Sequence, residues 1–325
     1  SPFTLGGAPC GLRRGLCQPA ALGPTAASAG APAPRVLAAY DIGSGLTKCE
    51  VAVVDRGNGG GRRVLFSGDR HLVLKAAMAK AGGTTIGEKG LAECAAVLRD
   101  FRDRAEALGA VEHAAVATAV FREATDGADF LQTVVHGELG IPVQIISQDL
   151  EGEIGFKTAV AVARDVGIDC STERLLCWDS GGGSFQLTGA REGGGYEVWC
   201  GPLGSASVTQ AMVEVVQGGF FSERQSPNPC TVEQCAALAE HVRARIGEAP
   251  QWLLARLERA APTVVGIGAR AGAFGNCAAA CGAPSWDATM LWGKIEELAG
   301  STDEDIRDAS FTTVPSILPK LVLVH

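Results

Sequence analysis

The chain has 325 residues, of which 46% are hydrophobic and 20% are charged, and it carries a formal net charge of −8. This length is sufficient for two domains, and the composition is that of an ordinary globular protein. The negative charge argues against nucleic-acid partners and membrane surfaces, but it leaves room for a polyanionic substrate, which needs only local positive charge and a metal.

Residues 1–35 differ in composition from the rest of the chain. They contain Arg13, Arg14 and Arg35 but no acidic residue, and they are rich in Ala, Gly and Pro. This composition predicts a disordered tail, and it is also typical of an organelle transit peptide or its remnant. The 11 cysteines include no Cys-x-x-Cys pair, which favours a reducing compartment. We therefore expect a cytoplasmic protein, or a mitochondrial or plastid one if residues 1–35 are a transit peptide.

Residues 36–150 are predicted to form a first domain with the order βββαβαβ. Alternating or continuous apolar runs predict its strands, and apolar residues that recur every three or four positions predict its helices. The expected strands are 36–40, 49–54, 63–67, 111–119 and 141–146, and the expected helices are 88–108 and 127–139.

Residues 151–325 are predicted to form a second domain in which the same pattern begins again. A helix that opens at Ser147 and runs to about Val166 leads into it. The expected strands are 175–178, 185–188, 196–200 and 263–267, and the expected helices are 205–216, 230–246, 252–260 and 290–298.

Each predicted domain begins with two strands joined by an Asp-led glycine turn. The first turn reads Asp41-Ile42-Gly43-Ser44-Gly45, and the second reads Asp179-Ser180-Gly181-Gly182-Gly183-Ser184. We expect these glycines to take positive φ angles and to direct backbone N–H groups toward one point, where an anion can bind. Carboxylate oxygens at the mouth of each turn suit a divalent metal. A simple hairpin without a ligand is the alternative interpretation of either turn.

Four stretches in this order resemble the exopolyphosphatase and guanosine pentaphosphate phosphohydrolase family, within the architecture of actin, heat-shock chaperones and sugar kinases. Two of the stretches are the glycine turns. The third is Ala117-Thr118-Ala119-Val120-Phe121-Arg122-Glu123-Ala124, and the fourth runs from Ile146-Ser147 to Glu151-Gly152. The resemblance covers most of residues 36–325.

The resemblance implies an α/β fold of two actin-like (ribonuclease H-like) domains, each with a mixed five-stranded sheet flanked by helices, and an active site in the cleft between them. It implies removal of the terminal phosphate from polyphosphate or guanosine pentaphosphate with Mg²⁺, and a possible homodimer. Glu151 matches the family's catalytic base and Arg122 its phosphate-contacting arginine. Asp41 and Asp179 match its metal- or water-holding acids, and the phosphate-binding turns correspond to Gly43, Ser44, Gly45, Gly181, Gly182, Gly183 and Ser184.

Other interpretations of these residues remain open at this stage. The helix dipole alone can explain acidic residues in a first helical turn, Glu151 included. The alternative to phosphate contact by Arg122 is that it is an ordinary surface arginine. Gln186 stands where the family usually has Glu, which motivates a non-catalytic polyphosphate or nucleotide sensor. Gly43-Ser44-Gly45 resembles the turn of actins, which favours an ATP-dependent small-molecule kinase, and Lys48 is either a phosphate contact or a solvated strand end.

Overall fold

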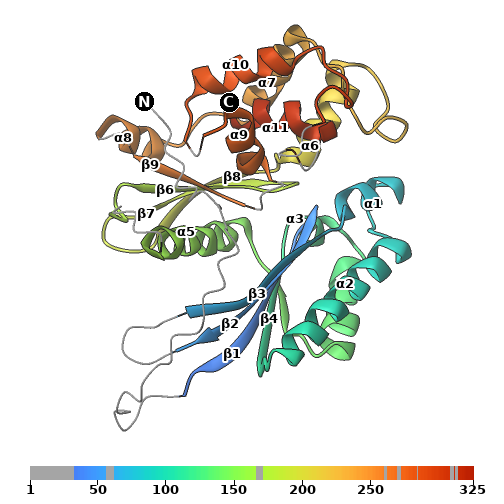
Figure 1. Cartoon of the computed structure of the whole chain (residues 1–325), viewed down its shortest axis with the longest axis vertical. Helices are drawn as coiled ribbons and strands as arrows, with labels where there is room; N and C mark the ends of the chain where they lie inside the picture. The colour runs from blue at the N-terminus through green and yellow to red at the C-terminus, as the bar shows by residue number, and fades with distance from the viewer. Residues whose placement is uncertain are drawn as a thin grey trace.

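The computed structural model describes residues 33–55, 62–165, 171–259, 262–268, 272–283, 285–307, 311 and 314–325. The predicted tail therefore lies outside the described residues, except for its last three positions. Two mixed sheets lie one above the other in the long direction of the molecule, each with helices packed against it (Figure 1). We use "N-terminal half" for residues 33–145 and "C-terminal half" for residues 148–325.

The N-terminal half is built on a five-stranded sheet, as predicted. Its strand order is β3-β2-β1-β4-β5, with β1 antiparallel to β2 and parallel to β4. The strands are β1 (Arg35–Ile42), β2 (Leu46–Val54), β3 (Arg62–His71), β4 (Glu112–Ala117) and β5 (Val143–Ile145).

The C-terminal half repeats this order with one strand fewer in the part of the chain that the structure describes. Its sheet has four strands in the order β8-β7-β6-β9, so the prediction of five strands is wrong for these residues. Each strand of the order β3-β2-β1-β4 has a counterpart, whereas β5 has none. The strands are β6 (Leu175–Ser180), β7 (Phe185–Ala190), β8 (Tyr196–Gly201) and β9 (Thr263–Ile267).

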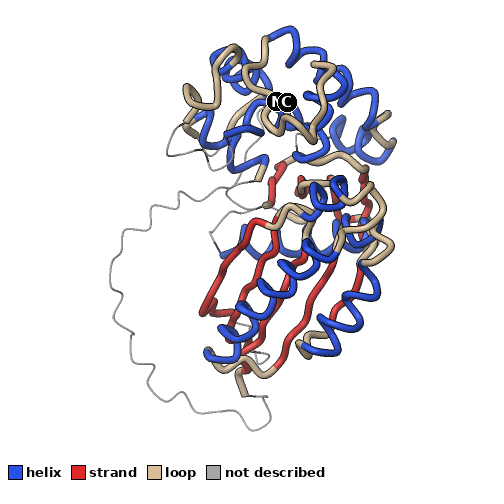
Figure 2. The backbone as a smooth tube through the Cα atoms, turned by 90° about the vertical axis from the view of Figure 1, so that its right-hand side faces the viewer, coloured by secondary structure: helices blue, strands red, loops and turns tan. Residues whose placement is uncertain are grey.

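Helices cover one side of the first sheet, where α2 lies along the strands (Figure 2). The core between them contains fully buried Leu98 and Phe101 from α2 and Ile42 and Val51 from the sheet. The prediction missed the short helix α1, whose N-cap residue Val73 makes no side-chain capping hydrogen bond. The helices are α1 (Leu74–Lys80), α2 (Glu88–Ala107), α3 (Ala119–Glu123), α4 (Gly127–Phe130) and the π-helix η1 (Leu131–Glu138).

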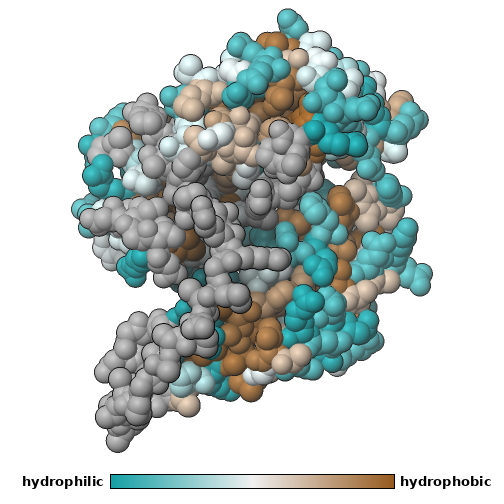
Figure 3. All heavy atoms as spheres, viewed as in Figure 1, coloured by the Kyte–Doolittle hydropathy of each residue, from teal (hydrophilic) through white to brown (hydrophobic). Residues whose placement is uncertain are grey.

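The second sheet carries helices on both faces. Helix α5 (Gln148–Asp165) packs against β6, β7 and β8 on the face toward the N-terminal half, and the other helices lie beyond the opposite face (Figure 1). On the face shown in Figure 3, the surface of this helical part combines hydrophilic residues with a band of hydrophobic ones. These helices are α6 (Ser205–Ala211), η2 (Met212–Val216), α7 (Val232–Ile246), α8 (Gln251–Arg259), α9 (Ala273–Cys281), α10 (Ala288–Leu298), η3 (Val314–Ser316) and α11 (Ile317–Val324).

None of the helices in the described part of the chain is long and apolar enough to cross a membrane.

Candidate functional site

The two glycine turns close in the same way. In the first turn the amide of Gly43 donates to the carbonyl of Leu46 at 3.0 Å, and in the second the amide of Gly181 donates to the carbonyl of Ser184 at 3.0 Å. Each turn thus joins a strand that ends near an aspartate, β1 or β6, to the antiparallel strand that follows. The predicted symmetry between the two hairpins is present in the backbone.

The carbonyl groups of each turn are held by the structure that follows its hairpin. In the N-terminal half, the amide of Lys75 in α1 donates to Ser44 at 3.2 Å. In the C-terminal half, the amides of Ser205 and Ala206, at the start of α6, donate to Gly181 and Gly182 at 2.9 Å each. Because the amides of Gly43 and Gly181 close the turns, an anion would have to be bound by the remaining amides of each turn.

The turn glycines are not needed for positive φ angles, which corrects the prediction. None of Gly43, Gly45 and Gly181–Gly183 has a left-handed backbone. Close contact restricts two of them. A Cβ atom at Gly43 would lie 2.8 Å from the carbonyl oxygen of Leu46 in the same turn, and one at Gly183 would lie 3.2 Å from Oγ of Ser44 in the other turn. A Cβ atom at Gly182 would be in ordinary contact at 3.5 Å, and one at Gly45 would meet nothing within 4 Å.

A cavity of about 590 Å³ lies between the two halves at these turns. Of the predicted site residues, Asp41, Gly43, Ser44, Gly45, Glu151, Asp179 and Gly181–Ser184 all line it, together with Lys48. Residues 138 positions apart in the sequence therefore meet at one site. Arg122 does not line the cavity but contacts a residue that does.

Two hydroxyl groups at the cavity are candidates for contact with a ligand. The Oγ atoms of Ser44 and Ser180 are buried, and among the described residues neither has a hydrogen-bond partner. A buried polar group without a partner destabilises the protein by about 1–3 kcal/mol, so such groups usually mark a site for water, an ion or a ligand.

Three carboxyl groups share the cavity and influence one another. Burial raises the pKa of Asp179 to about 7; the nearby Lys48 opposes this, and Glu151 and Asp41 add to it. Burial also raises the pKa of Glu151, against the opposing effects of Arg122 and Lys48. Converging carboxylates of raised pKa are typical of sites that bind a cation or exchange a proton.

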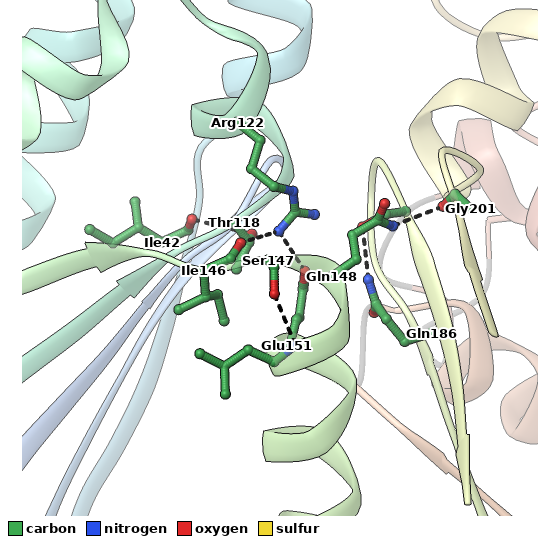
Figure 4. Close-up of polar contacts among 11 residues, drawn as sticks. Ile42, Thr118, Arg122, Ile146, Ser147, Gln148, Glu151, Gln186 and Gly201 are labelled. Atoms are coloured by element: carbon green, nitrogen blue, oxygen red, sulfur yellow. Dashed lines mark hydrogen bonds and ion pairs between the residues drawn. The ribbon is translucent and has the colours of Figure 1, made fainter. Parts of the chain in front are cut away.

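Glu151 is fixed near the start of α5. The Ser147 hydroxyl caps this helix by accepting from the amide of Leu150 at 3.2 Å. Nη1 of Arg122 donates to Oε2 of Glu151 at 2.9 Å and to the carbonyl of Ile146 at 2.8 Å (Figure 4). The pair is largely buried, with 21% and 17% of the two side chains exposed. This contact holds one carboxylate oxygen, whereas phosphate contact by Arg122 stays a prediction.

The two aspartates have different cross-strand neighbours. Asp41 lies opposite Lys48, whose Nζ donates to Oδ2 of Asp41 at 2.9 Å. Lys48 is therefore an ion-pair partner whose side chain is still 42% exposed, and its contact with a phosphate stays a prediction. Asp179 lies opposite Gln186, which is almost fully buried and whose Nε2 donates to Oγ of Ser184 at 3.3 Å. Gln186 therefore stabilises the second turn through its hydrogen bond to Ser184, and it supplies no charge to the site.

The donor set fits a magnesium ion that is shared with a substrate. In the described part of the chain, no group of three or more His, Cys, Asp and Glu side chains is arranged to hold a metal alone. Mg²⁺ usually takes one or two carboxylates and completes its shell with water and substrate phosphates. Asp41 and Asp179 line one cavity, and the charge of Asp41 contributes to the raised pKa of Asp179, which suits that mode.

Two site residues escaped the sequence analysis. Gly204 precedes α6, and a Cβ atom there would lie 2.5 Å from backbone atoms of Gly182 and Gly183. Lys320 lies within the apolar run 317–324 and lines the cavity from α11. A lone charge in an apolar run is a signal that sequence contains, whereas the close approach of Gly204 is a long-range contact that sequence does not reveal.

Comparison with known proteins identifies the same family that the motifs predicted. The model of the Ppx/GppA phosphatase family matches residues 53–245, more than half of the chain. Among solved structures, an Aquifex aeolicus PPX-GPPA enzyme is 19% identical with a TM-score of 0.61, and the match covers 90% of this chain and 91% of that one. An exopolyphosphatase from Cytophaga hutchinsonii is 14% identical with a TM-score of 0.65, covering 89% of each chain. At these identities the likeness concerns the fold. A search of curated proteins finds no match.

Proposed function

This chain belongs to the Ppx/GppA phosphatase family, and we propose that it removes the terminal phosphate from inorganic polyphosphate or guanosine pentaphosphate. The observation that carries the proposal is the meeting of Glu151 with both glycine turns in one cavity. The turns supply amides and hydroxyl groups for an anion, and Glu151 supplies a carboxylate of raised pKa beside them.

In the proposed reaction Glu151 orients a water molecule and accepts a proton from it. The water oxygen bonds to the terminal phosphorus, and the bridging P–O bond breaks, so that the shortened chain leaves with the bridging oxygen. Arg122 holds Oε2 of Glu151, which leaves the other oxygen for the water. In phosphoryl transfer, side chains and backbone amides act mainly by positioning the reactants and by stabilising charge in the transition state.

Magnesium would be held by Asp41 and Asp179, and when bound it would neutralise charge on the phosphate oxygens. Lys48 adds a further positive charge through its position beside Asp41.

The test is phosphate release from long-chain polyphosphate and, separately, from guanosine pentaphosphate, both with Mg²⁺. Glu151→Gln should lower release by about 10³-fold, within the usual range for removal of a general base. Glu153→Gln is the matched control, because Glu153 lies on the same helix, pairs with Lys157 and does not line the cavity. Equal activity in Glu151→Gln would exclude this residue as the base. Binding without release by the unaltered protein would instead support the non-catalytic sensor.

A further inference from the structure

A second cavity, which we call the sheet-face cavity, lies on the side of the C-terminal sheet that faces away from α5. Its volume is about 330 Å³. Side chains along a strand alternate between the two faces of a sheet. Asp179 points toward α5, because a Cβ atom at Gly155 of that helix would lie 3.9 Å from Oδ2 of Asp179. Trp178 and Ser180, its neighbours in β6, therefore point toward the helical layer on the other face, which Figure 1 shows.

The walls of the sheet-face cavity are mostly apolar. The strands supply Leu176, Trp178, Phe185, Leu187 and Trp199. Helices α7, α8 and α11 supply aliphatic side chains, and of the described residues that line the cavity, Ser180, Arg243 and His325 have polar side chains. A dry apolar cavity of about 150 Å³ binds benzene, so one about twice as large fits an apolar body of about ten carbon atoms.

The charge at the edge of the sheet-face cavity is positive. Arg243 of α7 lines the cavity with 56% of its side chain exposed, so its guanidinium lies where the cavity meets solvent. One of its five N–H groups donates to Glu240, and no Asp or Glu side chain is among the described lining residues. Arg243 also contributes to the lowered pKa of His325, so these two lining residues lie near each other. This end of the cavity suits an anionic group.

Three buried polar atoms at the sheet-face cavity have no hydrogen-bond partner among the described residues. They are Nε1 of Trp178, Oγ of Ser180 and Nδ1 of His325. Ser180 also lines the cavity at the glycine turns, whereas Trp178 and His325 do not. Buried polar atoms usually find a partner in the protein, in water or in a ligand. An occupant with polar atoms therefore suits this cavity better than a hydrocarbon does.

We propose that the sheet-face cavity binds an amphipathic carboxylate. Its apolar body of about ten carbon atoms lies between the sheet and the helices, where it covers the indole rings of Trp178 and Trp199. Its carboxylate accepts hydrogen bonds from the guanidinium of Arg243. The inference does not depend on the proposed function, because the cavity lies on the opposite face of the sheet from Asp179 and Glu151.

Calorimetric titration with decanoate and with decan-1-ol tests the proposal, because the two probes have the same chain and differ in charge. Decanoate should bind saturably at one site, about ten-fold more tightly than decan-1-ol, since a hydrogen bond to a charged group adds this much. Arg243→Gln should weaken decanoate binding by about ten-fold and change decan-1-ol binding by less than about two-fold. Arg245→Gln is the control, because Arg245 is an exposed residue of the same helix and does not line the cavity.

A variant that fills the sheet-face cavity locates the apolar body. Ala239 of α7 is buried and lines the cavity, so Ala239→Phe should weaken binding of both probes by more than about ten-fold and leave the melting temperature unchanged or higher. Arg243→Gln changes an exposed side chain and therefore tests the proposal whether or not position 239 tolerates a larger residue.

Three results would overturn the proposal. The first is the lack of saturable decanoate binding. The second is decanoate binding that is equal in the unaltered protein and in Arg243→Gln, or equal in an Ala239→Phe protein that melts normally. The third is a dimer in light scattering that Ala239→Phe dissociates and that binds no decanoate, which would assign the cavity to a second copy of the chain.

Discussion

The two glycine turns share a backbone design but differ in their side chains. Both close through one amide-to-carbonyl bond, and in both the carbonyls are engaged by the structure that follows the hairpin. The first turn places a half-exposed Asp41 against Lys48, whereas the second places Asp179, with its raised pKa, opposite the uncharged Gln186. The repeated part of the site is therefore the backbone of its two turns, and the side-chain chemistry differs between the halves.

The largest effect is expected for a substitution at Gly204, where the second turn contacts the residue that precedes α6. A Cβ atom at Gly204 meets backbone atoms at 2.5 Å, which cannot move aside as a flexible side chain can. Gly204→Ala should destabilise the protein by about 3 kcal/mol, the upper range for overpacking. Chemical denaturation measures the change. It should also lower phosphate release, since the turn must shift.

Gly293→Ala provides the control for this variant. Gly293 lies in α10, where a Cβ atom meets nothing within 4 Å, and it is remote from the cavity lining. Alanine in a helix interior should stabilise by about 0.5–1 kcal/mol. Similar stability of the two variants would show that the approach of Gly204 to the turn is not tight.

The second prediction concerns the raised pKa of Asp179. Because the folded protein holds this proton up to about pH 7, compared with the usual pKa of 3.8, the folded state binds it more tightly than the unfolded state. The free energy of unfolding should therefore fall as pH rises from about 4 to about 7, and it should then level off. Melting temperatures in EDTA between pH 4 and pH 9 measure this slope.

Asp179→Asn should reduce that slope, because the amide does not ionise. Part of the slope should remain, since the pKa of Glu151 is also raised. If the variant and the unaltered protein lose stability equally over this pH range, Asp179 is ionised in the fold and the contrast between the turns is wrong.

The smallest effect is expected for a substitution that makes the first turn resemble the second. Lys48→Gln removes the ion pair with Asp41, and loss of such a half-exposed pair should cost less than about 1 kcal/mol. Since Lys48 lowers the pKa of both Asp179 and Glu151, its loss should raise them and move the rising limb of the pH–activity profile to higher pH. If the rising limb stays at the same pH in the variant, Lys48 does not influence the pKa of the proposed base, Glu151.

Sequence reasoning worked best where the signal was local and long. The periodic segment predicted as 88–108 is a helix at Glu88–Ala107, and both Asp-led hairpins are present. The short helix α1 gave no capping signal, and α9 was not predicted as a helix. Both helices matter for the site, because α1 holds the first turn and α9 begins at the cavity.

The role of the turn glycines was not predictable for a different reason. A run of glycines indicates that side chains are excluded, but not which neighbour excludes them. For Gly183 the neighbour is Ser44 of the first turn, and the second turn in its turn leaves no room for a side chain at Gly204. Both contacts join residues that are distant in sequence. Likewise, the meeting of Arg122 with Glu151 depends on how α3 and α5 are placed relative to each other.

The ion pair between Arg122 and Glu151 joins the two halves of the molecule. Arg122 belongs to α3, which follows a strand of the first sheet, whereas Glu151 belongs to α5, which packs on the second sheet. The side chain of Glu151 is therefore held by a residue of the other half, so the relative placement of the two halves and the position of this carboxylate are set together.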